Sequence, residues 1–140
     1  HTCSSATFDI DQDGTSNLAK AYSQYTNHTG NQFTITQDGN DNVGYIDADE
    51  DNNEMTITQT GDDMEAEIYM SGDNNLYTIT QSGAGNHYAK FSGFGDDSTW
   101  TATQSGSGTT TMQPLRSQVA ATKMVISNLR TIPVTTARLT

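Results

Sequence analysis

The chain has 140 residues, of which 17 are acidic and only 6 are basic, so its formal net charge is −11. Only 32% of the residues are hydrophobic, and no continuous apolar segment is long enough to span a membrane. This composition excludes a large globular core, and the negative charge disfavours nucleic-acid binding because phosphate groups would be repelled.

Five segments alternate strictly between apolar and polar residues, and each of them ends in glutamine. They run over residues 8–12, 33–37, 55–59, 77–81 and 100–104. Period-two alternation that is rich in β-branched and aromatic residues predicts a half-buried strand. In the third segment, for example, Met55, Ile57 and Gln59 should point inward, whereas Thr56 and Thr58 should point outward.

A glycine stands two residues after each of these glutamines and predicts a tight turn that ends the strand, because glycine adopts positive φ without strain. Shorter alternations follow at 44–48, 66–70 and 89–93, and polar corners close the units at 51–53, 72–75 and 95–98. Each unit therefore predicts strand, glycine turn, strand and polar turn. The glutamines, spaced by 25, 22, 22 and 23 residues, and their glycines are Gln12/Gly14, Gln37/Gly39, Gln59/Gly61, Gln81/Gly83 and Gln104/Gly106.

A repeat of this length is too short to bury its own apolar face, so the copies must stack on one another. We predict an all-β fold: a β-solenoid of five stacked strand-turn-strand units, here called rungs, with two sheets face to face. An inward amide costs about 1–3 kcal/mol if it is left unpaired. Stacked at about 4.8 Å, each glutamine can instead bond the ones above and below. The predicted structural ladder also includes the asparagines five residues after a glutamine, Asn17, Asn42 and Asn86.

This pattern resembles the repeat of the curlin family, the secreted subunits of bacterial curli fibres. The family repeat runs Ser-x-x-x-x-x-Gln-x-Gly-x-Gly-Asn-x-Ala-x-x-x-Gln, and the segments 76–86 and 12–19 match its two parts. The second family glutamine is replaced by Ser23, Ala48, Met70 and Gly93. The first serine survives only as Ser98, with asparagine in the other copies, Asn31, Asn53 and Asn75.

The resemblance covers roughly residues 6–113, with a leader segment at 1–5 and a non-repeat tail at 114–140. It implies a cross-β, curlin-like amyloid fold and a protein that polymerises head to tail into extracellular fibres of the biofilm matrix, with a role in adhesion. The implied partners are further copies of the chain and the nucleator and secretion-pore proteins of curli systems, without nucleic acid, membrane insertion, cofactor or catalysis. The regular repeats favour a major subunit over a nucleator.

The N-terminal residues agree with a secreted product. The chain begins at His1 rather than at methionine, and we expect a leader to have been removed. A single cysteine, Cys3, cannot form an internal disulfide.

Charge is divided unevenly along the chain. All 17 acidic residues lie at or before Asp97, whereas the tail carries four cations and no acid. Opposite charges favour attraction between the tail and the body of the same or the next copy, and salt would weaken it. We therefore expect a tail junction formed by Arg116, Lys123, Arg130 and Arg138. Pro114 should stop the stack. The tail itself fits either extended structure at 124–126 and 132–136 or a helix.

Three other functions, namely ice binding, calcium binding and catalysis, explain fewer features of the sequence than a fibre subunit does. The alternative to a fibre is a monomeric ice-binding β-solenoid that uses the paired threonines Thr34/Thr36, Thr56/Thr58, Thr78/Thr80 and Thr101/Thr103, although Asp9 and Asp11 interrupt these columns. The segment 9–14 looks like the start of an EF-hand loop, but Lys20 stands where the last acidic ligand belongs, so no metal site is predicted. The three histidines, His1, His28 and His87, form no cluster. No hydrolase, zinc-protease or P-loop motif occurs, so we expect no enzyme.

Overall fold

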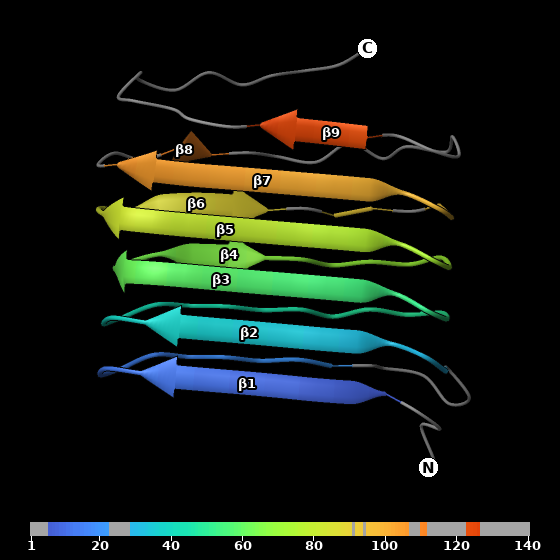
Figure 1. The fold of residues 1–140 in the computed structure, drawn as a ribbon, viewed down its shortest axis with the longest axis horizontal. Coiled ribbons are helices and arrows are strands. Elements are labelled where there is room, and N and C mark those ends of the chain that lie inside the picture. Colours follow the sequence, from blue (N-terminus) through green and yellow to red (C-terminus); the bar gives the residue numbers. More distant parts are fainter. Residues whose placement is uncertain are drawn as a thin grey trace.

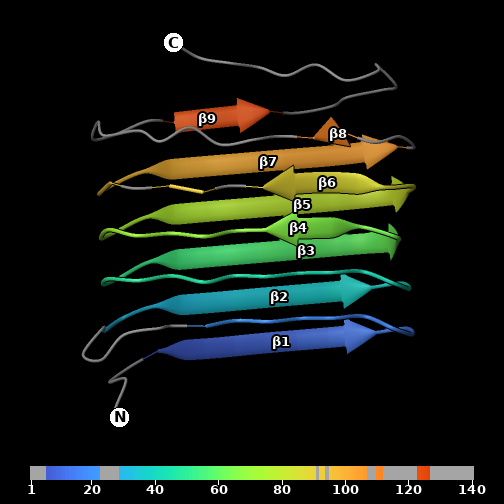
Figure 2. The same ribbon diagram turned by 180° about the vertical axis from the view of Figure 1, so that it is seen from behind.

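The computed structural model describes residues 6–22, 29–90, 92–93, 95–106, 110–111 and 123–126. Within these residues every regular element is a strand, and the strands form two parallel sheets of a β-solenoid (Figures 1 and 2). The long sheet contains β1 (Thr7–Asp13), β2 (Gln32–Asp38), β3 (Glu54–Asp62), β5 (Leu76–Ala84), β7 (Thr99–Gly106) and β9 (Lys123–Ile126). The short sheet contains β4 (Glu65–Glu67), β6 (His87–Lys90) and β8 (Thr110–Thr111). The predicted fold class is confirmed.

Equivalent residues of successive rungs are paired throughout the long sheet. Phe33 of β2 lies in register with Met55 of β3, and Gln37 lies in register with Gln59. The pairing continues without a slip from β3 to β5 and from β5 to β7. Because side chains alternate between the two faces of a strand, this register turns the same face of every strand inward.

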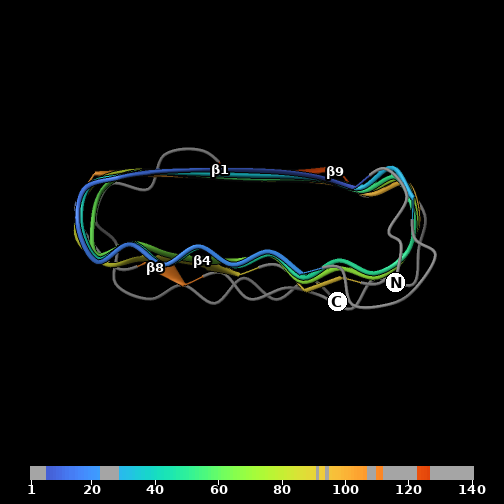
Figure 3. The same cartoon turned by 90° about the horizontal axis from the view of Figure 1, so that it is seen from below.

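The core is a thin apolar layer between the long sheet and the opposite side of the solenoid. Viewed along the stacking axis, the long sheet is flat and the opposite side is wavy (Figure 3). The threonines between the inward residues of the long sheet are only partly buried, as predicted. The buried core cluster is Phe33, Ile35, Ile46, Ala48, Met55, Ile57, Ala66, Ile68, Met70, Tyr77, Ile79, Ala89, Trp100 and Ala102.

The stacking of the glycine turns explains why no other residue stands at these positions. Gly39 and Gly61 both have a φ of 130°. A Cβ atom on Gly39 would lie only 2.0 Å from the carbonyl oxygen of Gly61 in the next rung. Stacked turns at strand spacing therefore require glycine for both its conformation and its lack of a side chain.

Two of the predicted turn glycines, Gly14 and Gly83, are exposed and differ in their place relative to the strand. Gly14 directly follows β1, as expected, whereas Gly83 lies inside β5, in register with Gly61 and Gly106. The expectation that the strand ends before the glycine is therefore corrected for Gly61, Gly83 and Gly106, which lie within β3, β5 and β7, because the backbone pairing continues through them. Both residues keep a positive φ, of 105° and 111°, and a Cβ atom on Gly83 would lie 2.5 Å from the carbonyl oxygen of Gly106.

The long sheet continues beyond the boundary expected at residue 113. Strand β9 pairs in parallel with β7, with Met124 in register with Trp100 and Ile126 in register with Ala102. Its sequence, Lys-Met-Val-Ile, has the apolar spacing of the segment 54–57. A repeat defined by glutamine and glycine does not include this strand, because no such pair follows it.

The short sheet is less regular than the alternation in the sequence predicts. Only two residues of the expected segment 66–70, Ala66 and Glu67, belong to a strand. Val43 makes isolated bridges to Leu18 and Glu65 in place of a continuous strand. Ala48 and Glu50 have φ values of 55° and 63°, which are incompatible with extended structure. The predicted segment 44–48 is therefore stacked without forming a strand of its own.

Candidate functional site

A continuous column of glutamine amides runs through the long sheet. The Nε2 of Gln37 donates to the Oε1 of Gln59 over 2.8 Å, and Gln59 donates in the same way to Gln81 over 2.9 Å. The column is extended by Gln81, which donates to Gln104 over 2.6 Å, and by Gln12, which donates to Gln37 over 2.5 Å. All four bonds have the same direction, from the N-terminal rung toward the C-terminal rung.

Each buried glutamine also bonds the opposite side of the solenoid with its second amide proton. Gln59, for example, donates to the carbonyl oxygen of Val43 over 3.0 Å. Both protons of the amide are therefore used, one along the stack and one across the core, so no donor of the group is buried without a partner. The equivalent bonds join Gln37 to Leu18, Gln81 to Glu65 and Gln104 to Tyr88.

A column of asparagines holds the glycine turns together. Asn17 donates from Nδ2 to the carbonyl oxygens of Asp13 and, in the next rung, Gly39, over 2.9 and 2.8 Å. Its Oδ1 accepts the backbone N–H of Asn42 over 3.0 Å. Asn42 repeats the pattern toward Gly61 over 2.7 Å. The structure thus brings two of the three predicted asparagines into one column.

The third predicted asparagine, Asn86, is not in this column, and this expectation is corrected here. Asn86 is exposed, whereas the next residue, His87, is buried with 3% of its surface accessible. The His87 Nε2 lies 3.0 Å from the carbonyl oxygen of Gly106, the equivalent of the bonds that Asn17 and Asn42 make. Two residues, 63 and 64, lie between the paired positions of the third repeat, whereas three, 85–87, lie between those of the fourth. His87 therefore takes the position of the asparagine.

A second asparagine column, which the sequence analysis did not identify, lies at the opposite corner. The Oδ1 of Asn31 accepts the backbone N–H of Asn53 over 2.8 Å, and Asn53 accepts that of Asn75 over 2.9 Å. Asn75 accepts the N–H of Ser98 over 2.8 Å. Each of these residues stands six positions before a ladder glutamine, and this constant spacing is the signal by which they could have been found.

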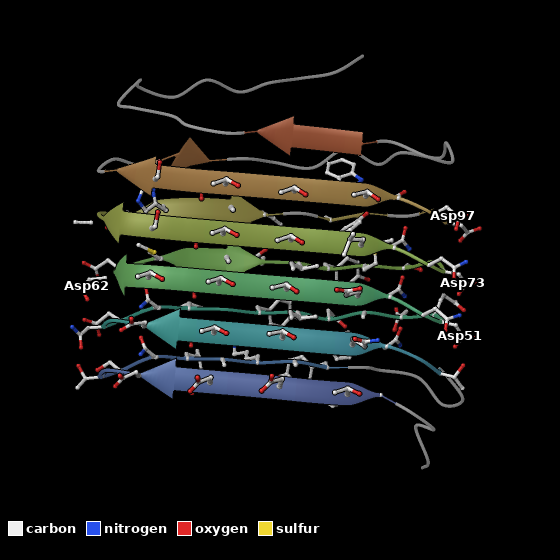
Figure 4. The ribbon with its side chains drawn as sticks, viewed as in Figure 1. Asp51, Asp62, Asp73 and Asp97 are labelled. Carbon is white, nitrogen blue, oxygen red and sulfur yellow. The ribbon has the colours of Figure 1, made fainter. Side chains whose placement is uncertain are left out.

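The acidic corners use their carboxylates to cap turns. The Oδ1 of Asp73 accepts the backbone N–H of Asp51 over 2.8 Å, and the Oδ1 of Asp96 accepts that of Asp73 over 3.0 Å. Figure 4 shows Asp51, Asp73 and Asp97 along one edge of the solenoid and Asp62 along the other. In the part of the chain that the structure describes, no group of three or more His, Cys, Asp or Glu residues is placed to hold a metal ion.

The two outward faces differ in chemistry. On the long sheet the threonines form columns in register, such as Thr56 with Thr78. The opposite face carries tyrosines and charged residues. There the Tyr45 hydroxyl donates to Asp47 over 2.8 Å, and burial together with Asp47 raises the pKa of Tyr45 to about 12. Lys90 forms an ion pair with Glu67, which raises the pKa of the lysine.

The first rung is open. Phe8 and Ile10 of β1 are 48% and 47% exposed, whereas the equivalent Phe33 and Ile35 of β2 are 1% and 0% exposed. Among the described residues, only β2 pairs with β1, so the other edge of this strand has no partner. The N-terminal end of the stack therefore exposes an apolar surface and an unpaired strand edge together.

Of the four residues of the predicted tail junction, the structure describes one, Lys123. Lys123 begins β9, in register with Thr99 of β7. The other three members of the predicted junction, Arg116, Arg130 and Arg138, lie outside the described residues, as do Cys3 and the expected leader segment 1–5.

Comparison with known families identifies the repeat. The family model described as the curlin associated repeat matches twice, at residues 29–61 and 51–83. The two matches include the buried glutamines Gln37, Gln59 and Gln81 with their turns. No curated protein and no solved structure matched the chain. Among the described residues there is no helix that is long and apolar enough to cross a membrane.

Proposed function

This chain belongs to the curlin family of structural fibre subunits, and we propose that it polymerises head to tail into extracellular, curli-like amyloid fibres. The biofilm matrix and adhesion to surfaces are the settings in which such a fibre acts. The regular repeats favour the role of major subunit.

The observation that carries the proposal is the open first rung. Phe8 and Ile10 are about half exposed at positions that are fully buried one rung further on. An exposed apolar surface of this kind marks an interaction site, and an unpaired strand edge recruits a further strand. A solenoid that stays monomeric needs a polar cap at each end, and β1 has no cap among the described residues.

The direction of the glutamine column supports a joint between unlike ends. All four bonds between ladder amides donate toward the C-terminal rung, and the Oε1 of Gln12 accepts no bond from any described residue. A donor on the last rung of another copy would complete this group. Contacts between unlike ends do not close on themselves, so they generate a filament.

The test is assembly of the purified full-length chain. We expect fibres by electron microscopy, with a diffraction spacing of about 4.8 Å along the fibre axis. Ile10→Asp should slow assembly strongly, because it puts a charge on the open apolar surface. Thr58→Asp, which adds the same charge to the outward face of the interior strand β3, is the matched control and should have a small effect. A chain that stays monomeric for days at high concentration would contradict the proposal.

The ice-binding alternative is tested with the same preparation. The threonine columns end at Asp9 and Asp11, which lie in register with Thr34 and Thr36. We therefore expect no thermal hysteresis from the soluble chain. A clear hysteresis that Thr56→Val abolishes would favour the alternative.

A further inference from the structure

We propose that β1 of a second copy pairs with β9, so that adjacent subunits are joined by a parallel β9–β1 strand pair. This inference rests on the proposed function and adds to it the identity of the two strands and their register. It assigns a specific role to a segment of the tail that lies outside the recognisable repeats.

The first argument is the place of β9 in the long sheet. It is the outermost strand after β7, and it covers the β7 edge from Thr99 to Ala102 (Figure 1). An incoming strand in the register of the solenoid therefore meets β9 over these residues and not β7. Among the described residues no strand pairs with the outer edge of β9, so this is the edge that continues the long sheet.

The second argument is the direction of the backbone groups. In a parallel sheet alternate residues bond to opposite neighbours. The backbone N–H of Thr7 donates to the carbonyl oxygen of Asn31 in the next rung, just as that of Leu76 donates to Ser98. The alternate residues Phe8 and Ile10 therefore turn their N–H and C=O groups to the open edge of β1. By the same alternation Lys123 and Val125 turn theirs to the free edge of β9. The two edges are therefore complementary in their hydrogen-bonding groups.

The third argument is the match of apolar residues. Continuing the register of the solenoid pairs Phe8 with Met124 and Ile10 with Ile126. The same two combinations already occur inside the protein, where Phe33 pairs with Met55 and Ile35 pairs with Ile57. The joint would thus reproduce the β2–β3 pairing and would cover the apolar side chains that β1 exposes.

The fourth argument is charge. β1 carries Asp9, Asp11 and Asp13 and no cation, whereas β9 begins with Lys123 and no acidic residue follows Asp97. In the continued register Lys123 is opposite Thr7, and Asp9 is the next residue of β1 on that face. Opposite charges at the two ends favour this joint over contacts between like ends.

The experiment is seeded elongation with full-length chains. Val125→Pro removes an N–H group from the free edge of β9, at the kind of edge position where proline is tolerated. Val125→Thr keeps the N–H and is the matched control. We expect seeded elongation of Val125→Pro to be at least about tenfold slower, which corresponds to about 1.4 kcal/mol. The control should elongate at the wild-type rate.

A mixing experiment makes the test directional. Val125→Pro chains still present an intact β1, so they should add to wild-type fibre ends and then block further addition there. Small fractions of this variant should therefore inhibit the elongation of wild-type fibres, whereas the same fractions of Val125→Thr should not. Elongation of pure Val125→Pro at the wild-type rate would overturn the inference. Faster elongation would also overturn it, because β9 would then be a cap that an incoming β1 displaces.

A charge swap tests the same joint without proline. Lys123→Glu should slow elongation at low salt, and the double variant Lys123→Glu/Asp9→Lys should restore it. Failure of the second change to rescue the first would contradict the register. If the wild-type chain forms no fibre at all, the proposed function itself is wrong, whereas wild-type fibres with unaffected variants would reject only the β9–β1 joint.

Discussion

The long and short sheets are built from the same repeats, yet they differ in regularity. β2, β3, β5 and β7 are seven to nine residues long and pair without a slip. β4, β6 and β8 are two to four residues long, and Val43 contributes only isolated bridges. Both sides bury apolar side chains, so burial alone does not account for the difference.

The difference lies in the buried amides. The long sheet carries a glutamine column in which each amide fixes its neighbour in the next rung, whereas Ala48, Met70 and Gly93 stand at the positions of the second family glutamine. Apolar contacts tolerate small shifts, but a hydrogen bond does not. We attribute the regularity of the long sheet to this column, since a slip of one residue would leave every amide buried without a partner.

The largest effect is expected from removing one amide of the column. Gln59→Ala leaves the Nε2 of Gln37 and the Oε1 of Gln81 with one partner fewer. At about 1–3 kcal/mol per buried unsatisfied group, the loss of unfolding free energy for these two groups should be about 2–6 kcal/mol. Thr58→Ala, on the outward face of the same strand, should cost less than about 0.5 kcal/mol. Chemical denaturation measures both, and equal losses would mean that the strand faces have been assigned in reverse.

A lone amide in the short sheet should be harmful rather than helpful. Met70→Gln buries an amide between Ala48 and Gly93, neither of which has a side chain that could bond to it. We expect a loss of about 2 kcal/mol for this unsatisfied group, against less than about 1.5 kcal/mol for the volume-matched Met70→Leu. If Met70→Gln were as stable as the wild type, a stacked column would not be needed to accommodate a buried glutamine.

Packing across the core gives a smaller effect. A Cβ atom on Gly93 would lie 2.5 Å from the Tyr77 hydroxyl oxygen. Gly93→Ala should therefore cost about 1–2 kcal/mol through overpacking. In the background of Tyr77→Phe, which lacks that oxygen, the same change should cost at least about 0.5 kcal/mol less. Additive effects in this double-mutant cycle would show that the two sites do not contact each other.

The smallest effect is a gain in stability at the corner that precedes β3. Glu50 has a φ of 63° and stands where the next rung has Gly72, whose φ is 105°. A left-handed conformation costs roughly 1–2 kcal/mol for a residue that has a Cβ atom. Glycine avoids this cost, but part of the gain in stability is lost because glycine is more flexible in the unfolded chain. Glu50→Gly should raise the unfolding free energy by about 0.5–1 kcal/mol. The control Asn52→Gly should gain less, because asparagine tolerates this conformation.

Much of this arrangement follows from the sequence because the signal is local and repeated. Alternation around Ile35, Ile57 and Ile79 predicts both the strands and their inward face, and the recurrence of a glutamine at the end of each alternating segment predicts the register. The amide bonds across the core were not predictable in this way, since they depend on carbonyl oxygens such as that of Val43 in a segment without a regular strand.

The remaining differences at the turns have physical causes as well. His87 replaces the expected Asn86 because a one-residue insertion can be accommodated at several points of a turn, and only the packing decides which one. Gly83 lies inside β5, whereas Gly14 lies just beyond β1, although both have the positive φ of a turn. Sequence predicts that conformation from the residue type, but how far the backbone pairing extends past it depends on the neighbouring rungs.

Two further features lack the signal that defines the repeat. Extended structure at 124–126 is one of the two alternatives that the sequence leaves open, but the sequence does not place β9 in the stack, because this strand keeps the apolar spacing of a rung without its glutamine and glycine. The column of Asn31, Asn53 and Asn75 was overlooked because these residues were considered only as replacements for a serine.

The most direct measurement of the central claim is hydrogen exchange of the glutamine side-chain amides by NMR. The account predicts slow exchange for the Nε2 protons of Gln37, Gln59 and Gln81, which are buried and donate to two acceptors each. Gln32, whose side chain is exposed, should exchange at the rate of a free amide, and Gln12 should become protected only when fibres form. Equal and rapid exchange of all five side chains would contradict the glutamine column.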